Sequence, residues 1–122
     1  EYTSFDIRDL LEVRALDVIQ PDAAIIGGIS EAMRVSHLAS VNQLELAPHC
    51  WGSAFSFMAG LNVAFASSSA IIIEFSLGGN PMMYDLVKEQ ITVTDGVTDA
   101  PKLPGLGLTP QWDFVKEFTQ KI

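Results

Sequence analysis

Three ionisable residues lie at or just beyond the ends of short apolar segments, and their types fit acid–base chemistry. Asp22 follows LDVIQP, His49 follows LELAP, and Glu74 lies within AIIIEF. If these segments are strands of a parallel sheet, their carboxyl ends meet at one edge, where α/β proteins place their active sites. The sequence therefore predicts that three side chains from distant parts of the chain converge, although no local motif joins them.

An Asp, a His and a Glu at one edge have a clear division of chemical roles. The Asp22 carboxylate can accept a hydrogen bond from one nitrogen of the His49 imidazole, which fixes the tautomer and leaves the other nitrogen as a general base. A partly desolvated carboxyl group such as Glu74 can stay protonated and donate a hydrogen bond to an anionic substrate. We therefore predict that Asp22, His49 and Glu74 are catalytic residues, and that Glu74 also binds the substrate.

Each of the three residues also has a purely structural interpretation. An Asp after a proline commonly starts a turn or caps a helix. A lone His is often a hydrogen-bonded structural residue. A Glu within an apolar segment is harder to explain in this way, because burying an unpaired carboxylate is costly. Taken singly, Asp22 and His49 favour the structural interpretation, whereas three strand ends in register favour a functional one.

The apolar pattern predicts alternating helices and strands that would position these side chains. Helical periodicity covers three segments, and short apolar runs closed by proline or rich in β-branched residues cover three others. The predicted helices are 4–12, 30–41 and 53–66, and the predicted strands are 16–19, 44–47 and 70–75. Beyond them we expect a hairpin at 91–99 that turns at Asp95-Gly96, an irregular segment at 101–107 and a helix at 112–119. The strict alternation predicts an α/β fold with a parallel sheet.

Other residues give weaker chemical signals. Gly27-Gly28 lacks a complete phosphate-loop signature, so a tight turn from a strand into a helix is the better interpretation. Cys50 follows His49 directly, and adjacent side chains at a strand end point apart, so we interpret Cys50 as a buried or lining residue rather than a nucleophile. Trp51 is a candidate substrate-binding residue, with a position in the core or at the rim as an equal alternative. The histidines and the cysteine show no zinc-site spacing, and we predict no metal ligand.

The composition limits the class of protein. The 122 residues fit one domain, and 48% hydrophobic with 18% charged residues exclude a disordered chain. The net charge of -8 repels phosphate backbones and anionic lipid, so we expect no nucleic-acid partner and no membrane partner. A basic-then-apolar leader is absent, and we expect a cytoplasmic location. The chain begins at Glu1 rather than Met, which a mature or engineered N-terminus and a fragment of a larger chain explain equally well. The motifs described next favour the fragment.

Four strings stand out when they are taken together and in order. They are DVIQPDAAIIGGISEAMRVSHLA, LAPHCWGSAFSFMAGLNVAFA, IIIEF and DGVTDAPKLPGLGL. This combination resembles the C-terminal part of the mandelate racemase/muconate lactonizing enzyme family, within the enolase superfamily, over nearly the whole chain. The resemblance implies that residues 1–77 form a partial (β/α) barrel, the last three β/α units of a TIM-like barrel. It also implies that residues 78–122 form a C-terminal segment that returns to a capping domain.

The resemblance also implies roles for individual residues. Asp22 and His49 fall on the family's Asp–His dyad, in which the His removes the proton α to a carboxylate. Glu74 falls on the acid that hydrogen-bonds the substrate or its enediolate. Members with a lysine base carry it two residues before the Gly-Gly pair, where this chain has Ile25. The sequence therefore resembles the His-base branch, and we expect an acid-sugar dehydratase, with a mandelate-type racemase or epimerase as the alternative.

Part of the family's machinery would lie outside this chain. The resemblance implies Mg²⁺ in the parent enzyme, held by acids on strands upstream of Glu1, and we expect this chain alone to bind none. The parent would be a Mg²⁺-dependent lyase or racemase acting on a small carboxylate or acid sugar, and this chain alone would be inactive. A non-catalytic structural fragment is the other hypothesis. Open sheet edges predict a partner, either the missing N-terminal half or a second copy of the chain.

Overall fold

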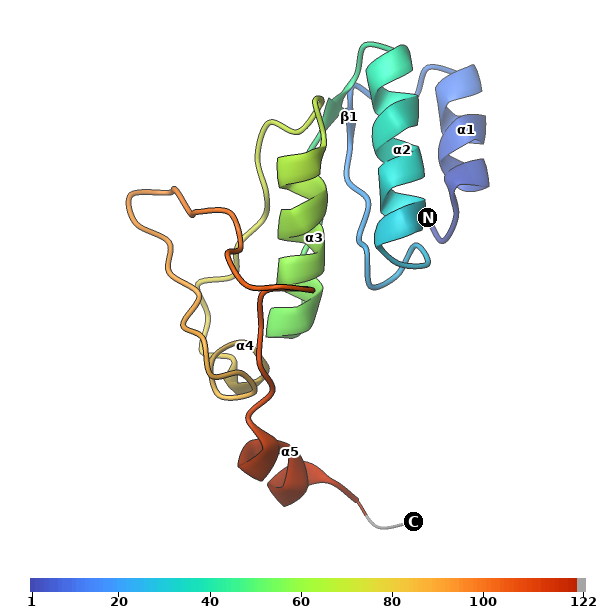
Figure 1. The fold of residues 1–122 in the computed structure, drawn as a ribbon. Coiled ribbons are helices and arrows are strands. Elements are labelled where there is room, and N and C mark those ends of the chain that lie inside the picture. Colours follow the sequence, from blue (N-terminus) through green and yellow to red (C-terminus); the bar gives the residue numbers. More distant parts are fainter. Residues whose placement is uncertain (121–122) are drawn as a thin grey trace.

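The computed structural model describes residues 1–120, in which helices and short strands alternate over residues 4–66 and helices alone follow (Figure 1). The elements in chain order are α1 (Ser4–Glu12), β1 (Val18–Ile19), α2 (Ile29–Val41), β2 (Glu45–Leu46), α3 (Ala54–Ala66), α4 (Pro81–Tyr84) and α5 (Trp112–Phe118). The predicted alternation is confirmed as far as the end of α3. Among the described residues, none of the helices combines the length and the hydropathy that crossing a bilayer would require.

The strands form a small parallel sheet that sets the geometry of the site. β1 pairs with β2 in parallel, with Val18 opposite Glu45 and Ile19 opposite Leu46. On its other side Leu46 forms a parallel bridge with Ala70. The three segments therefore run in the same direction, and the residues that follow each of them leave the sheet at the same end.

The predicted strand at 70–75 is wrong in its extent, because only Ala70 enters the ladder. The Leu46 N–H donates to the Ser69 carbonyl oxygen at 2.8 Å, and the Ile71 N–H donates to the Leu46 carbonyl oxygen at 3.0 Å. The neighbouring strand β2 is two residues long, so it offers little further backbone to pair with. No segment among residues 1–120 pairs with the opposite side of residues 71–75. The β-branched side chains favoured a strand here, but regular pairing also needs a neighbour of matching length.

The predicted hairpin at 91–99 is confirmed only at its turn. The Thr94 and Val97 backbones exchange two hydrogen bonds of 2.9 Å. Asp95 and Gly96 between them have φ angles of 52° and 77°, as a two-residue hairpin turn requires. The flanking residues form no longer ladder, so the predicted strands of this hairpin are absent from the described structure.

A first group of buried side chains joins α1, α2 and the sheet. Val35 on α2 and Leu46 on β2 are completely buried, and Ile7 on α1 and Ile19 on β1 lie in the same cluster. Figure 1 shows α1, α2 and α3 with their axes running alongside one another. The apolar faces of these helices therefore fix the sheet, and with it the ends of β1 and β2.

A second group of buried side chains joins α3 to the C-terminal segment. Phe57 and Leu61 on α3 cluster with Met83 on α4 and with Leu86 and Val87 beyond it. The segments on either side of the predicted boundary between residues 77 and 78 thus share one apolar cluster, and the boundary itself stays a prediction. Residues 121–122 of that predicted C-terminal segment lie outside the described residues.

Candidate active site

The Asp22 side chain is held in place by the turn that follows β1. The Ile26 N–H donates to the Asp22 carbonyl oxygen at 2.8 Å, and the Ala24 N–H donates to Asp22 Oδ1 at 2.8 Å. The carboxylate is 6% exposed. The structural role that the sequence suggested for this residue, a turn cap, is therefore present, and it uses only one of the two carboxylate oxygens.

The His49 imidazole lies against the other oxygen of that carboxylate. Backbone pairing continues beyond the strands, because the Ala47 N–H donates to the Ile19 carbonyl oxygen at 2.9 Å and the His49 N–H donates to the Pro21 carbonyl oxygen at 3.2 Å. This pairing brings His49 Nδ1 within 2.8 Å of Asp22 Oδ2. An ionised carboxylate can only accept, so Nδ1 carries the proton in this arrangement and Nε2 keeps a free lone pair.

Glu74 lies on the opposite side of the imidazole from Asp22. The Glu74 N–H donates to the Pro48 carbonyl oxygen at 3.3 Å, which aligns this segment with the loop that carries His49. Glu74 Oε2 is 3.6 Å from His49 Nε2 and 3.4 Å from the Cys50 backbone nitrogen. The Glu74 side chain is 50% exposed and that of His49 is 41% exposed. The structure thus brings the three predicted residues together, with Nε2 on the side of the imidazole where Glu74 lies.

Cys50 is buried, which agrees with the interpretation from the sequence. The residue is 2% exposed, and its Sγ atom lies 3.9 Å from the Pro48 carbonyl oxygen. Burial, followed by the negative charges of Asp22 and Glu74, raises the pKa of the Cys50 thiol to about 12. A thiol of this kind is protonated at neutral pH, which argues against a nucleophilic role.

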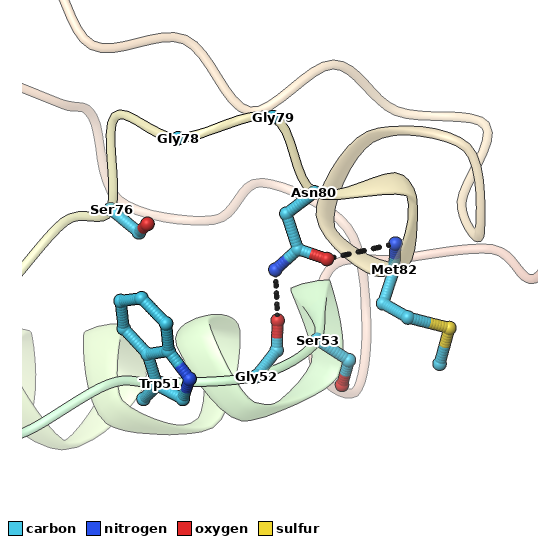
Figure 2. Close-up of a pocket in the computed structure, with 8 residues that line it drawn as sticks. All are labelled: Trp51, Gly52, Ser53, Ser76, Gly78, Gly79, Asn80 and Met82. Carbon is cyan, nitrogen blue, oxygen red and sulfur yellow. Dashed lines mark hydrogen bonds between the residues drawn. The ribbon is translucent and has the colours of Figure 1, made fainter.

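Trp51 lies beside a cavity of about 410 Å³ rather than in the core (Figure 2). The indole is 69% exposed. The cavity is bounded by the loop after His49 and the loop after Glu74, and its lining residues are Trp51, Gly52, Ser53, Ser76, Gly78, Gly79, Asn80 and Met82. The dyad residues do not line it. The core alternative for Trp51 is excluded, and its contact with a substrate stays a prediction.

The Gly27-Gly28 pair forms the turn that leads into α2. The two glycines have φ angles of 106° and 98°, a conformation that residues with a Cβ rarely adopt. The Gly28 N–H donates back to the Ala23 carbonyl oxygen at 3.0 Å. The interpretation of this pair as a tight turn is confirmed, and Ile25 lies half-exposed within the same turn.

Comparison with known protein families finds one that matches most of the chain. The family described as enolase C-terminal domain-like matches residues 1–114. The chain belongs to this family.

The relatives of this enolase C-terminal domain-like chain include curated enzymes and solved structures. The chain is 34% identical over 115 residues to a D-xylonate dehydratase of Haloferax volcanii, and the alignment covers 94% of the chain and 28% of the relative. It is 33% identical over 120 residues to an arabinonate dehydratase of Saccharolobus solfataricus, covering 98% of the chain and 32% of the relative. A mandelate racemase/muconate lactonizing enzyme-like protein from Rubrobacter xylanophilus superposes with a TM-score of 0.86 at 31% identity, covering 99% of the chain and 31% of that protein. The chain therefore spans about 30% of the length of these relatives.

No Mg²⁺ site is formed by the described part of this enolase C-terminal domain-like chain. Within residues 1–120 no group of His, Cys, Asp and Glu side chains is arranged to hold a metal ion. Asp22 and Glu74 contact opposite nitrogens of the His49 ring, so their carboxylates do not converge on a common point. The residues present do not fit a Mg²⁺ ion, and their own chemistry is that of acids and bases.

Asn80 is a residue of this site that the sequence interpretation missed. Its side chain connects the two loops that bound the cavity, since Asn80 Nδ2 donates to the Gly52 carbonyl oxygen at 2.6 Å (Figure 2). The available signal was the Asn-Pro pair, because Asn is a favoured N-cap and Pro is favoured at the first position of a helix. That signal predicts a helix start, but it does not predict the contact with Gly52.

Proposed function

We propose that this chain is the C-terminal part of an acid-sugar dehydratase, in which His49 removes the proton α to the substrate carboxylate. The observation that carries the proposal is the 2.8 Å contact between Asp22 Oδ2 and His49 Nδ1, which leaves Nε2, on the Glu74 side of the ring, as the nitrogen that can take a proton. The dehydratase names of the two curated relatives support the choice of reaction. In this proposal the described segment supplies the last β/α units of a barrel, and the upstream part of a longer polypeptide supplies the rest.

Three residues of this chain have separate roles in the proposed reaction. His49 Nε2 takes the α-proton, and the C–H electron pair moves into the substrate carboxylate to give an enediolate. The buried Asp22 carboxylate stabilises the imidazolium that forms, because it already accepts the Nδ1 hydrogen. Glu74, beside Nε2, hydrogen-bonds the substrate. The hydroxyl group on the neighbouring carbon then leaves as water with the proton held by the His49 imidazolium, which returns to the neutral base. The electron pair of the enediolate forms the double bond between the α- and β-carbons, giving an enol that becomes a 2-keto acid.

A racemase or epimerase is the second candidate, because it begins with the same proton transfer. The name of the Rubrobacter xylanophilus structure supports this alternative. The two reactions differ in the fate of the enediolate, since a racemase returns a proton to the same carbon and retains every hydroxyl group. Formation of a 2-keto acid therefore separates dehydration from racemisation.

The test uses the full-length polypeptide that carries this segment and a panel of acid sugars. Incubation in D₂O with NMR detection reports loss of the α-proton, and a carbonyl reagent reports the keto product. For His49→Asn we expect the rate of proton loss to fall by roughly 10²–10⁴-fold, because a general base contributes about that much. Retention of α-proton exchange in His49→Asn would overturn the role of His49. If the wild-type polypeptide exchanges the α-proton of none of these acids, the proposed function is wrong.

A further inference from the structure

Two loops of the site run side by side and are joined at both ends. At one end the Glu74 N–H donates to the Pro48 carbonyl oxygen at 3.3 Å. At the other end the Asn80 side chain donates to the Gly52 carbonyl oxygen at 2.6 Å. The cavity of about 410 Å³ lies between these loops. The Asn80 contact therefore joins the two loops at the end farther from Glu74.

Asn80 is itself fixed by the start of α4. Its Oδ1 accepts the Met82 N–H at 3.1 Å, and its carbonyl oxygen accepts the Met83 N–H at 2.9 Å. Met83 is buried in the second apolar cluster, so α4 is anchored to α3. Because Met82 supplies a donor and Gly52 an acceptor, the orientation of the Asn80 amide group is determined by its two partners. A rigid anchor thus presents the Asn80 NH₂ group to the opposite loop.

The segment between these two connections has little else to hold it. No hydrogen bond within the described residues involves the backbone of 75–79. Phe75 packs edge-on against Phe57 with ring centroids 5.2 Å apart, and the residues after it are half-buried or exposed. The Glu74 carboxylate makes only long contacts, 3.4 Å to Cys50 N and 3.6 Å to His49 Nε2. Contacts of that length do not fix a half-exposed side chain, so its position depends on the backbone that carries it.

We propose that Asn80 is a positioning residue for the acid–base site. By tying the loop after Glu74 to the loop after His49, its side chain keeps the Glu74 carboxylate beside the Nε2 face of the imidazole. This inference rests on the proposed function, in which Glu74 hydrogen-bonds the substrate. Small displacements of such a group lower the rate of the chemical step more than they weaken substrate binding.

The variants that test the proposal keep the cap of α4 and remove the donor to Gly52. Asn80→Ser retains an N-cap hydroxyl that is too short to reach Gly52, and Asn80→Asp retains an acceptor of the same size. Asn62→Ser is the matched control, because Asn62 Nδ2 donates to the Met58 carbonyl oxygen at 2.7 Å within α3 and joins no loops. In the full-length polypeptide we expect both Asn80 variants to lower kcat by roughly ten- to a hundredfold with KM changed by less than about threefold. Asn62→Ser should leave kcat unchanged.

A double-mutant cycle distinguishes positioning from a general structural role. If Asn80 acts through Glu74, Asn80→Ser should lower kcat by less than about threefold in a Glu74→Ala background, because coupled residues are not additive. An equal effect of Asn80→Ser in both backgrounds would overturn the proposal, as would full activity of both Asn80 variants. Loss of soluble protein in both would assign Asn80 to folding and would overturn it too.

Hydrogen exchange provides a readout that does not depend on activity. Asn80→Ser should accelerate exchange of the Glu74 amide, which donates to the Pro48 carbonyl oxygen, whereas Asn62→Ser should not. If the wild-type polypeptide acts on no acid sugar, the proposed function fails while this measurement still tests the connection between the loops. Unchanged exchange of the Glu74 amide in Asn80→Ser would overturn the inference even in an active enzyme.

Discussion

The Asp22 carboxylate joins its own turn to the neighbouring loop, with Oδ1 2.8 Å from the Ala24 nitrogen and Oδ2 2.8 Å from His49 Nδ1. The turn cap and the contact with the imidazole are therefore properties of one side chain, and neither excludes the other. Because the carboxylate is almost fully buried, it has no freedom to exchange these partners for water. The orientation of the His49 ring is consequently fixed before any substrate binds.

Asp22→Asn tests whether this contact sets the tautomer of His49. The Asn oxygen can still accept the Ala24 N–H, but its NH₂ group would then face His49 Nδ1. The ring would respond by carrying its proton on Nε2, where it can no longer act as a base. We expect kcat of the full-length polypeptide to fall by roughly 10²–10⁴-fold with little change in melting temperature, as for tautomer-setting carboxylates elsewhere. Activity within threefold of wild type would show that Asp22 does not control the tautomer.

Glu31→Gln tests a contact that joins α1 to α2 through a carboxylate. Glu31 accepts hydrogen bonds from the Ser4 hydroxyl and from the Ser4 N–H, and it pairs with Arg34. These contacts, the Ser4 hydroxyl first, lower the pKa of Glu31 from 4.5 to about 2. A lowered pKa in the folded state means that this stabilisation is complete above about pH 4.5 and is lost as the pH falls from 4.5 to 2.

The measurement for Glu31 is the urea midpoint as a function of pH. We expect Glu31→Gln to lower the midpoint at pH 7 and to flatten its decline between pH 4.5 and 2. Arg34→Gln is the control, because Arg34 is largely exposed and its ion pair is screened by solvent, so a smaller effect is expected. Identical pH profiles for wild type and Glu31→Gln would refute this account of the contact.

The sequence predicted the parts of the fold that local pattern and topology control. The helices at 4–12, 30–41 and 53–66 agree with the structure within a residue, because apolar periodicity and capping residues act over short distances. The meeting of Asp22 with His49 followed from the parallel direction of two strands, which the alternation of elements predicted.

Features that depend on long-range partners could not be predicted in the same way. Ile71 and Ile72 have strong strand propensity, but whether they join a sheet depends on the backbone beside them, and the described chain supplies little of it. The contact between Asn80 and Gly52 joins residues 28 positions apart and leaves no periodic trace in the sequence. Local preferences indicate that Asn80 begins a helix, and only the packed structure shows that its NH₂ group donates to Gly52.

Gly60→Ala tests the close approach of α3 to the loop that carries His49. A Cβ atom at Gly60 would lie 2.4 Å from Cys50 Sγ, far inside van der Waals contact. In an open helix the change would be favourable by up to about 1 kcal/mol. Here we expect a net loss of about 1–3 kcal/mol in the free energy of unfolding, because the buried thiol has no room to move.

The partner variant Cys50→Ala makes the Gly60 prediction specific. Removing the sulfur should abolish the clash, so that Gly60→Ala becomes neutral or stabilising in the Cys50→Ala background. Urea denaturation of the two single variants and the double variant measures this directly. The steric explanation is wrong if Gly60→Ala is equally destabilising in both backgrounds.

The Cys50 thiol should be unreactive in the folded protein. Its raised pKa of about 12 and its burial leave almost no accessible thiolate at pH 8. We expect Ellman's reagent to label Cys50 in urea but not under native conditions. Rapid stoichiometric labelling of a protein that remains folded would contradict this prediction.

The same thiol makes the stability of the fold depend on pH. Because the pKa of Cys50 in the folded state lies above the unfolded value of about 9, the contribution of this thiol to stability is complete below pH 9 and declines as the pH rises from 9 to 12.

The side chains of Ile71 and Ile72, 57% and 65% exposed, determine how the 122-residue segment should behave when it is prepared by itself. Exposed apolar side chains bind fluorescent hydrophobic dyes, and they also favour association between copies of the segment. Repulsion between copies that each carry a net charge of -8 opposes the association but not the binding of dye. Light scattering from the isolated segment should therefore increase with salt, which screens the repulsion and leaves the isoleucine attraction intact.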